Sequence, residues 1–136
     1  PHASSSAASD VYKRQDNKLE TLNLEFKDLF LVGFSQGTMM SIQYAISQKK
    51  EIAGVLGYSG KIFDYVFLSK SLNSRPKIKF LHGNIDEIVP VEEMYKAVDF
   101  LKLNRFNVEY KVYDNLSHAI SPEGISDGLN FIKKNI

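Results

Sequence analysis

From residue 16 onward, short apolar runs rich in β-forming residues alternate with longer segments in which apolar residues recur every three or four positions. This alternation is typical of a parallel β-sheet covered by helices. The predicted strands are residues 28–32, 53–58, 77–81 and 108–113. The sequence therefore predicts the α/β class, with a mainly parallel sheet of about four strands flanked by helices.

Helices are predicted after the first, third and fourth of these strands. Their apolar residues share one helical face and are expected to pack on the sheet. The last helix is predicted to begin with Ser121 as its N-cap and Pro122 at its first position. The expected buried stripes are Met39, Ile42 and Ile46; Met94, Ala97, Val98 and Leu101; and Ile125, Leu129, Ile132 and Ile136.

Two segments do not fit this pattern. Residues 1–15 are rich in serine and alanine, end in basic residues and lack the apolar core of a signal peptide, so we expect a non-native or disordered leader. Residues 61–76 contain apolar side chains without a regular period, which fits either an excursion packed on the core or part of an acyl-group pocket. No linker divides residues 16–136, which we treat as one folding unit.

Composition excludes several functions. Lysine and arginine number 17 against 16 aspartates and glutamates, so no broad field favours nucleic acid or an anionic membrane. The chain has no cysteine, which excludes disulfides, thiolate zinc sites and a cysteine nucleophile, and favours a cytoplasmic location. Its apolar runs are far shorter than the roughly 20 residues that span a bilayer, so no membrane span is expected.

The segment Gly33-Phe34-Ser35-Gln36-Gly37 lies between a predicted buried strand and a predicted helix. A G-x-S-x-G sequence in this context is typical of a nucleophilic serine on a tight strand-to-helix turn. Side chains at 33 and 37 are expected to collide with the neighbouring strand and helix, which explains both glycines. The N–H of Gln36, at the helix N-terminus, is the first candidate for an oxyanion donor. The alternative is a glycine-rich connection without chemistry.

A serine nucleophile needs a histidine base, and the base needs a carboxylate that fixes its tautomer. Asp86 follows the strand at 77–81, and His118 follows the strand at 108–113. Because the carboxyl ends of parallel strands meet at one edge of the sheet, both are expected beside Ser35. The sequence thus predicts a catalytic triad of Ser35, Asp86 and His118.

Other residues compete for these roles. His82 lies at a strand end too early for the base, and His2 lies in the predicted leader. Glu87 or Asp114 could replace Asp86 only if the loop were shifted. Taken alone, Asp86 also fits a turn residue or a helix N-terminal partner, and a lone loop histidine fits a solvated side chain.

The segments LVGFSQGTMM, GYSG, FLHGNIDEIVP and SHAISPEG resemble the phospholipase/carboxylesterase family of α/β-hydrolases, which includes acyl-protein thioesterases and small bacterial carboxylesterases. The resemblance covers residues 16–136, and GFSQG and the HGxxDxxVP pattern are fairly specific for the family. It implies Ser35 as nucleophile, Asp86 as acid, His118 as base and the Gln36 amide as one oxyanion donor. It also implies carboxylic ester or acyl thioester substrates, no metal or organic cofactor, and the homodimers that many members form.

The chain departs from the family pattern before Ser35. A full member begins with several more strands, and a loop after one of them supplies the second oxyanion amide. Only residues 16–27 precede the first predicted strand, whereas a βαβ unit needs about 30 residues or more. We therefore expect residues 16–136 to be the C-terminal portion of a single α/β-hydrolase domain, with residues 29–32 at an open sheet edge. The alternatives are a truncated, catalytically incompetent fragment, a non-catalytic relative, or a serine peptidase of the same fold.

Overall fold

The structure is a computed structural model that describes residues 13–14 and 16–136. The rest of the predicted leader, residues 1–12 and 15, lies outside the described residues, whereas residues 13–14 and 16–22 are helical. The remaining elements, in chain order, are the 3₁₀ helix η1 (Phe26–Asp28), β1 (Phe30–Phe34), α2 (Gln36–Ser47), β2 (Gly54–Tyr58), α3 (Tyr65–Ser69), β3 (Lys77–Gly83), α4 (Val91–Leu103), β4 (Val108–Tyr113) and α5 (Pro122–Lys134).

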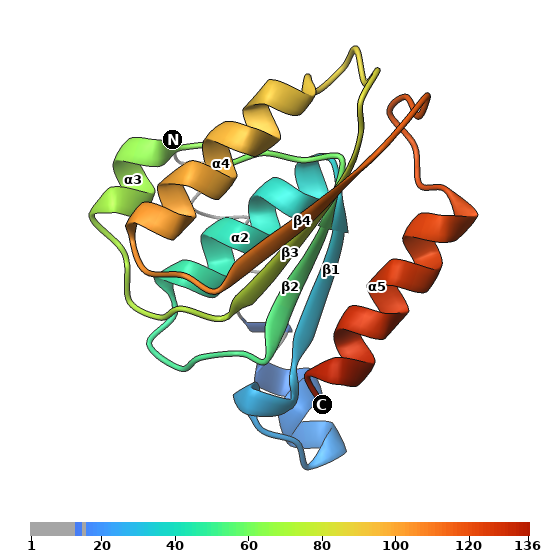
Figure 1. The fold of residues 1–136 in the computed structure, drawn as a ribbon. Coiled ribbons are helices and arrows are strands. Elements are labelled where there is room, and N and C mark those ends of the chain that lie inside the picture. The colour runs from blue at the N-terminus through green and yellow to red at the C-terminus, as the bar shows by residue number, and fades with distance from the viewer. Residues whose placement is uncertain (1–12, 15) are drawn as a thin grey trace.

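The four strands form one parallel sheet in the order β1-β2-β3-β4, which confirms the predicted fold class. Helices α2, α3 and α4 cover one face and α5 covers the other (Figure 1). The first strand begins at Phe30 rather than at the predicted residue 28, because residues 26–28 form the turn of η1. Since all four strands run in the same direction, their carboxyl ends share one edge of the sheet.

The main apolar core lies between the sheet and helices α2 and α4. The predicted stripe of α4 is wholly buried, and so are Ile42 and Ile46 of α2, whereas Met39 is only half-buried. These side chains pack on Val55, Ile78 and Phe80, which point to the same face of the sheet. The core thereby holds α2, and with it the start of that helix, in a fixed position against β1 and β2.

The face of α5 that packs on the sheet is not the one that its apolar residues predicted. Its N-cap is as expected, since the Ser121 hydroxyl accepts a hydrogen bond of 3.0 Å from the Gly124 N–H. The predicted buried stripe is wrong, however: Ile125 and Leu129 are each 53% exposed and Ile136 is 93% exposed, while Ile132 is only partly buried. Gly124, Gly128 and Phe131 are the residues of α5 that are buried instead.

Close approach at Gly128 explains this orientation. A Cβ atom at position 128 would lie 2.2 Å from the Tyr58 hydroxyl oxygen and 2.7 Å from a Leu56 methyl carbon. The Tyr58 hydroxyl also donates a hydrogen bond of 2.8 Å to the Gly124 carbonyl. The helix therefore meets the sheet through its glycines, and its larger aliphatic residues point away from the contact.

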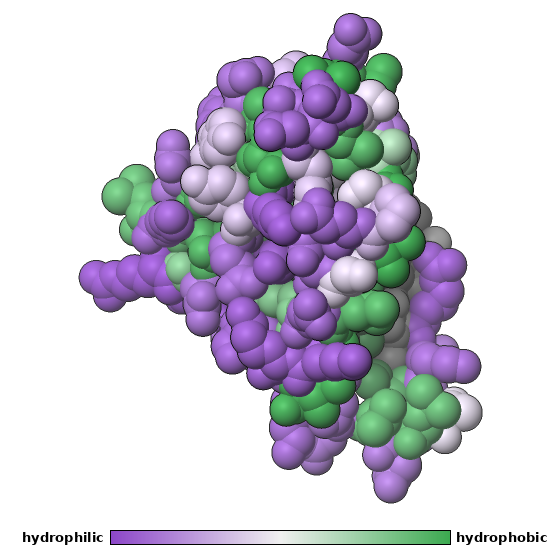
Figure 2. All heavy atoms as spheres, turned by 45° about the vertical axis from the view of Figure 1, so that its right-hand side comes forward, coloured by the Kyte–Doolittle hydropathy of each residue, from purple (hydrophilic) through white to green (hydrophobic). Residues whose placement is uncertain are grey.

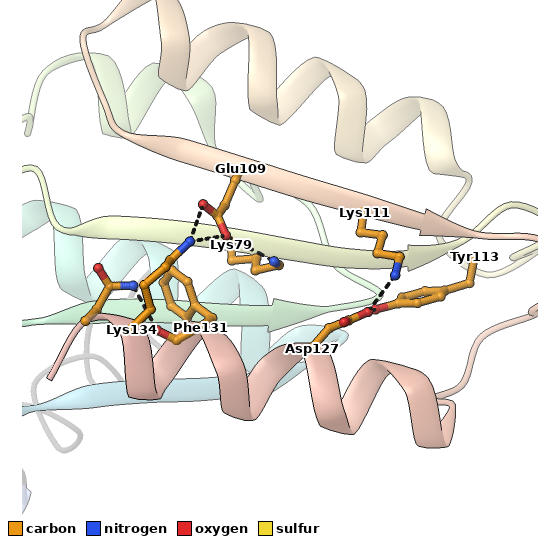
Figure 3. Close-up of polar contacts among 8 residues, drawn as sticks. Lys79, Glu109, Lys111, Tyr113, Asp127, Phe131 and Lys134 are labelled. Atoms are coloured by element: carbon orange, nitrogen blue, oxygen red, sulfur yellow. Dashed lines mark hydrogen bonds and ion pairs between the residues drawn. The ribbon is translucent and has the colours of Figure 1, made fainter.

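Charged side chains line the seam between α5 and strands β3 and β4 (Figure 3). Glu109 contacts the ammonium groups of Lys79 at 3.0 Å and Lys134 at 3.2 Å. Asp127 accepts hydrogen bonds from the Tyr113 hydroxyl at 2.5 Å and from Lys111 at 3.0 Å. Figure 2 brings the α5 side of the molecule forward and shows hydrophilic side chains interspersed with smaller apolar patches.

Residues 61–76 contain the short helix α3. Ile62 and Leu68 are buried in the main core, so this part of the segment packs as an excursion over α2 and α4. Phe63 and Val66 are 65% and 67% exposed. A role in an acyl-group pocket stays a prediction. None of the helices in the described part of the chain is both long and apolar enough to cross a membrane.

Candidate active site

Ser35 occupies the turn between β1 and α2. Its backbone has φ 55° and ψ −114°, a strained conformation for a residue with a side chain, and its N–H donates a hydrogen bond of 2.9 Å to the Tyr58 carbonyl. A Cβ atom at Gly33 would lie 2.4 Å from the carbonyl carbon of Gly37. The tight turn therefore requires glycine at 33, as predicted, and it points the Ser35 side chain out of the sheet edge.

The predicted steric need for glycine at position 37 is wrong. A Cβ atom at Gly37 would have no neighbouring atom within 4 Å in the described part of the chain. The reason is that Gly37 lies on the exposed first turn of α2, whereas Gly33 faces that turn from the end of β1. Only one of the two glycines in the motif is fixed by contacts in this structure.

Thr38 joins the turn to the end of β2. Its hydroxyl donates a hydrogen bond of 2.9 Å to the Tyr58 carbonyl, which is the same oxygen that accepts from Ser35. A Cβ atom at Gly57 or Gly60 would approach the Thr38 side chain to 2.5 Å or 2.4 Å. These two glycines let α2 lie close to β2 and hold the serine turn on the sheet.

The structure brings the three predicted side chains into contact. The Nδ1 atom of His118 lies 2.8 Å from Oδ2 of Asp86, and its Nε2 atom lies 3.1 Å from the hydroxyl oxygen of Ser35. Asp86 comes from the loop between β3 and α4, and His118 from the loop between β4 and α5. The Asp86 side chain is completely buried, whereas that of His118 is 20% exposed. This order of hydroxyl, imidazole and carboxylate can activate a serine.

Asp86 is held by main-chain donors on its other oxygen. Its Oδ1 atom accepts hydrogen bonds from the N–H groups of Ile88 at 2.9 Å and Val89 at 2.8 Å. Burial acts to raise the pKa of this carboxyl, but the hydrogen bonds from His118, Val89 and Ile88, with the charge of His118, bring that pKa below its usual value. Asp86 is therefore ionised at neutral pH and favours the tautomer of His118 that carries its proton on Nδ1. Nε2 is left to accept a proton from Ser35.

The competing residues that the structure describes have other partners or are exposed. His82 is buried in β3, where its Nε2 atom lies 2.7 Å from the Val89 carbonyl and 3.5 Å from Oδ2 of Asp86. Glu87 is exposed, and Asp114 accepts a long hydrogen bond of 3.3 Å from Asn84. His2 lies outside the described residues. Asp86 is thus the carboxylate that contacts His118.

Two neighbours of the site were not predicted from the sequence. The ring of Phe34 lies against His118, with 4.8 Å between the ring centroids and 48° between the ring planes. Asn84 makes hydrogen bonds to the loop that carries His118. Phe34 occupies a variable position of the G-x-S-x-G motif, and Asn84 lies far from His118 in sequence, so neither gave a periodic or motif signal.

Gln36 is the first residue of α2, and its side chain is exposed. Its main-chain N–H is among those that a helix leaves without an intrahelical partner at its N-terminus. The position and chemistry of this N–H fit the predicted oxyanion donor, whose role stays a prediction.

Two cavities lie away from the three side chains. One, of about 690 Å³, lies beside the N-terminal segment, and the other, of about 230 Å³, lies beside the end of α5. Ser35, Asp86 and His118 line neither of these two cavities.

The sequence is similar to known proteins over most of its length. A family model described as Phospholipase/Carboxylesterase matches residues 4–136. Acyl-protein thioesterase 1 of Eremothecium gossypii is 31% identical over 120 residues, which cover 83% of this chain and 50% of that protein. A probable inactive carboxylesterase of Oryza sativa subsp. japonica is 28% identical over 97 residues, covering 69% of this chain and 40% of that protein. The chain spans about half the length of the first of these relatives.

Solved structures share the fold. The crystal structure of esterase PE8 superposes with a TM-score of 0.94 at 22% sequence identity, and the match covers 98% of this chain and 62% of that one. At this level of identity the similarity shows the arrangement of strands and helices.

Proposed function

Because the chain belongs to the phospholipase/carboxylesterase family, we propose that it is the part of a serine hydrolase that carries the catalytic triad. The substrates are carboxylic esters or acyl thioesters, and the reaction passes through an acyl-enzyme. One observation carries the proposal: His118 lies within hydrogen-bond distance of both the Ser35 hydroxyl, at 3.1 Å, and the Asp86 carboxylate, at 2.8 Å. Homodimer formation and a cytoplasmic location stay predictions.

In the first half of the reaction, the Ser35 oxygen attacks the acyl carbonyl carbon while Nε2 of His118 takes the hydroxyl proton. Asp86 stabilises the imidazolium that forms. The carbonyl oxygen becomes an oxyanion, and the N–H of Gln36 donates to it from the start of α2. When the intermediate collapses, the carbon–oxygen or carbon–sulfur bond breaks, and the leaving alcohol or thiol takes the proton from His118. Ser35 is then acylated.

In the second half, His118 removes a proton from water, whose oxygen attacks the acyl carbon. The new tetrahedral intermediate expels the Ser35 oxygen, which recovers its proton from His118, and the carboxylic acid is released. The cycle involves no oxidation or reduction, and His118 gives up each proton that it accepts. This chain supplies the nucleophile, the base, the carboxylate and one oxyanion donor of the cycle, and water is the second reactant.

Hydrolysis of two matched substrates tests the proposal. A short-chain aryl ester and the thioester of the same acyl group are compared for the wild-type protein and for Ser35→Ala. Turnover of both substrates is expected to fall by at least about three orders of magnitude, since members of a triad act as a unit. Ser126→Ala changes an exposed serine of α5 and is the matched control, expected to keep the wild-type rate. Undiminished turnover in Ser35→Ala would contradict the proposal.

A second candidate concerns the chain as it stands. We propose that residues 16–136 form the C-terminal portion of a single α/β-hydrolase domain, and that this portion alone is catalytically incompetent because a second oxyanion donor comes from elsewhere in the domain. The coverage of about half of each relative favours this reading. The test compares the aryl ester turnover of residues 16–136 with that of a longer protein that also contains any segment encoded upstream, and equal turnover would contradict the proposal.

A further inference from the structure

The loop that carries Asp86 and the loop that carries His118 are tied together by Asn84. The Asn84 side-chain oxygen accepts a hydrogen bond of 2.8 Å from the Asn115 N–H. Its side-chain nitrogen lies 3.3 Å from the Asp114 carboxylate, and its main-chain N–H donates at 3.0 Å to the Tyr113 carbonyl. One residue therefore contacts three consecutive residues at the end of β4. We call this set of hydrogen bonds the Asn84 strap.

Direct contact between the two loops continues beyond the strap. The N–H of Ile85 donates a hydrogen bond of 3.1 Å to the Leu116 carbonyl. A Cβ atom at Gly83 would lie 2.1 Å from that same carbonyl oxygen and 2.6 Å from the Ser117 carbonyl. Glycine at 83 is thus required for the loop of His118 to lie so close to β3. Asn115 has a positive φ of 59°, so the strap holds a turn that costs conformational energy.

Asn84 is placed to act on the site without touching it. It precedes Asp86 by two residues, and its partner Asn115 precedes His118 by three residues. Asn84 is exposed and is not part of the apolar core. Each hydrogen bond described for its side chain reaches the loop of His118. The side-chain hydrogen bonds of Asn84 therefore hold the two loops at a fixed distance from each other.

We propose that Asn84 is a positioning residue that sets the contact between Asp86 and His118 by fixing their two loops against each other. This inference rests on the proposed hydrolase function. The physical reason is that an error of about 1 Å in the placement of a catalytic group costs orders of magnitude in rate. The carboxylate and the imidazole come from separate loops, so their 2.8 Å contact depends on what joins those loops.

Kinetics of Asn84→Ala, measured with the aryl ester in the longer protein that also contains any segment encoded upstream, test the inference. We expect kcat to fall roughly tenfold with KM unchanged, since two modest hydrogen bonds are removed and the substrate is not touched. Asn84→Asp keeps an acceptor for the Asn115 N–H but opposes a second carboxylate at Asp114, so its loss is expected to be intermediate. Asn107→Ala, an exposed asparagine at the opposite edge of the sheet, is the matched control and keeps the wild-type kcat.

A second variant separates positioning from a general structural role. In the Asp86→Ala background there is no carboxylate to position, so adding Asn84→Ala is expected to lower the rate by less than about twofold. Amide hydrogen exchange gives a readout that needs no turnover: the Asn115 N–H should exchange faster in Asn84→Ala, while amides of α2 keep their protection.

The outcomes distinguish the two proposals. An active wild-type protein whose kcat is unchanged by Asn84→Ala overturns the inference and leaves the hydrolase function intact. A full tenfold loss that persists in the Asp86→Ala background also overturns it, because the effect would then not pass through the carboxylate. If a longer protein that also contains any segment encoded upstream has no hydrolase activity, the hydrolase function is overturned, and with it the catalytic role of Asn84, whatever the exchange of Asn115 shows.

Discussion

The two faces of the sheet are stabilised by different kinds of contact. On the face covered by α2, α3 and α4, a continuous apolar cluster extends through all three helices. On the face covered by α5 alone, the apolar cluster is small, and charged groups fill the rest of the seam (Figure 3). The buried residues of this second cluster are Leu56, Tyr58, Leu81, Tyr113 and Phe131.

The two faces therefore hold different parts of the site. The apolar face fixes α2 and therefore Ser35, whose main chain is bonded to β2. The α5 face controls the other side of the site, because His118 lies on the loop between β4 and α5. Apolar packing changes little with pH, whereas carboxylates and ammonium groups respond to it. We therefore expect Ser35 to be held rigidly and His118 to be held by contacts that pH can weaken.

The largest expected effect is the loss of a phenylalanine from the apolar face. Phe80→Ala removes a side chain with no exposed surface and should lower the free energy of unfolding by about 3–5 kcal/mol. Phe131→Ala on the α5 face should cost about 3 kcal/mol or less, since Phe131 borders a cavity into which its surroundings can relax. Urea denaturation measures both. If Phe131→Ala lowered the free energy of unfolding more than Phe80→Ala does, the α5 face would contribute more to stability than the apolar face, which would contradict this difference.

A smaller effect is expected where α5 approaches the sheet through glycine. Gly128→Ala places a methyl group 2.2 Å from the Tyr58 oxygen, so α5 must shift, at a cost of about 1–3 kcal/mol. Gly37→Ala is the matched substitution in α2, where the new methyl group meets open space. Thermal unfolding should show Gly37→Ala to be neutral or slightly stabilising, since alanine favours helix more than glycine does. Equal destabilisation by both would contradict the orientation of α5.

Acid should loosen α5 before it affects the apolar face. Burial acts to raise the pKa of Glu109, but hydrogen bonds from Lys79 and Lys134 lower it by more. Hydrogen bonds from Tyr113 and then Lys111 lower the pKa of Asp127. Because these folded pKa values are depressed, their stabilisation is complete above the unfolded carboxyl pKa and is lost as pH falls through the folded values.

Hydrogen exchange along the chain measures this effect. Amides of α5 should lose protection as the pH falls below about 4, the ordinary range of carboxyl groups, while amides of α2 keep theirs. The double variant Glu109→Gln and Asp127→Asn removes both titrating groups and should flatten the pH dependence in α5. Loss of protection in α2 and α5 at the same pH would show that the two faces do not differ in this way.

The sequence predicted the parts of the molecule that depend on local pattern. The strand-to-helix context of Ser35 and the placement of Asp86 and His118 after later strands were enough to predict that all three meet at one edge. The same holds for the buried stripe of α4, where each apolar residue at helical spacing is buried. In these cases periodicity and chain order fix the outcome without knowledge of the partners.

The features that the sequence did not predict depend on contacts between distant segments. The rotation of α5 depends on the fit of Gly128 against Tyr58, which overrides the aliphatic pattern of Ile125 and Leu129. The space for a side chain at position 37 depends on which side of the turn faces solvent. Asn84 finds Asp114 and Asn115 only because β3 and β4 are neighbours in the sheet. None of these contacts has a sequence period.

The central claim, that Ser35 is a nucleophile activated by His118, is tested most directly by the rate at which a fluorophosphonate probe modifies the protein, mapped by peptide mass spectrometry. We expect one modified peptide, which contains Ser35, and no modification in Ser35→Ala. We also expect His118→Ala to slow labelling by roughly a hundredfold or more, because a general base is lost. Modification at another residue, or a rate unaffected by His118→Ala, would contradict it.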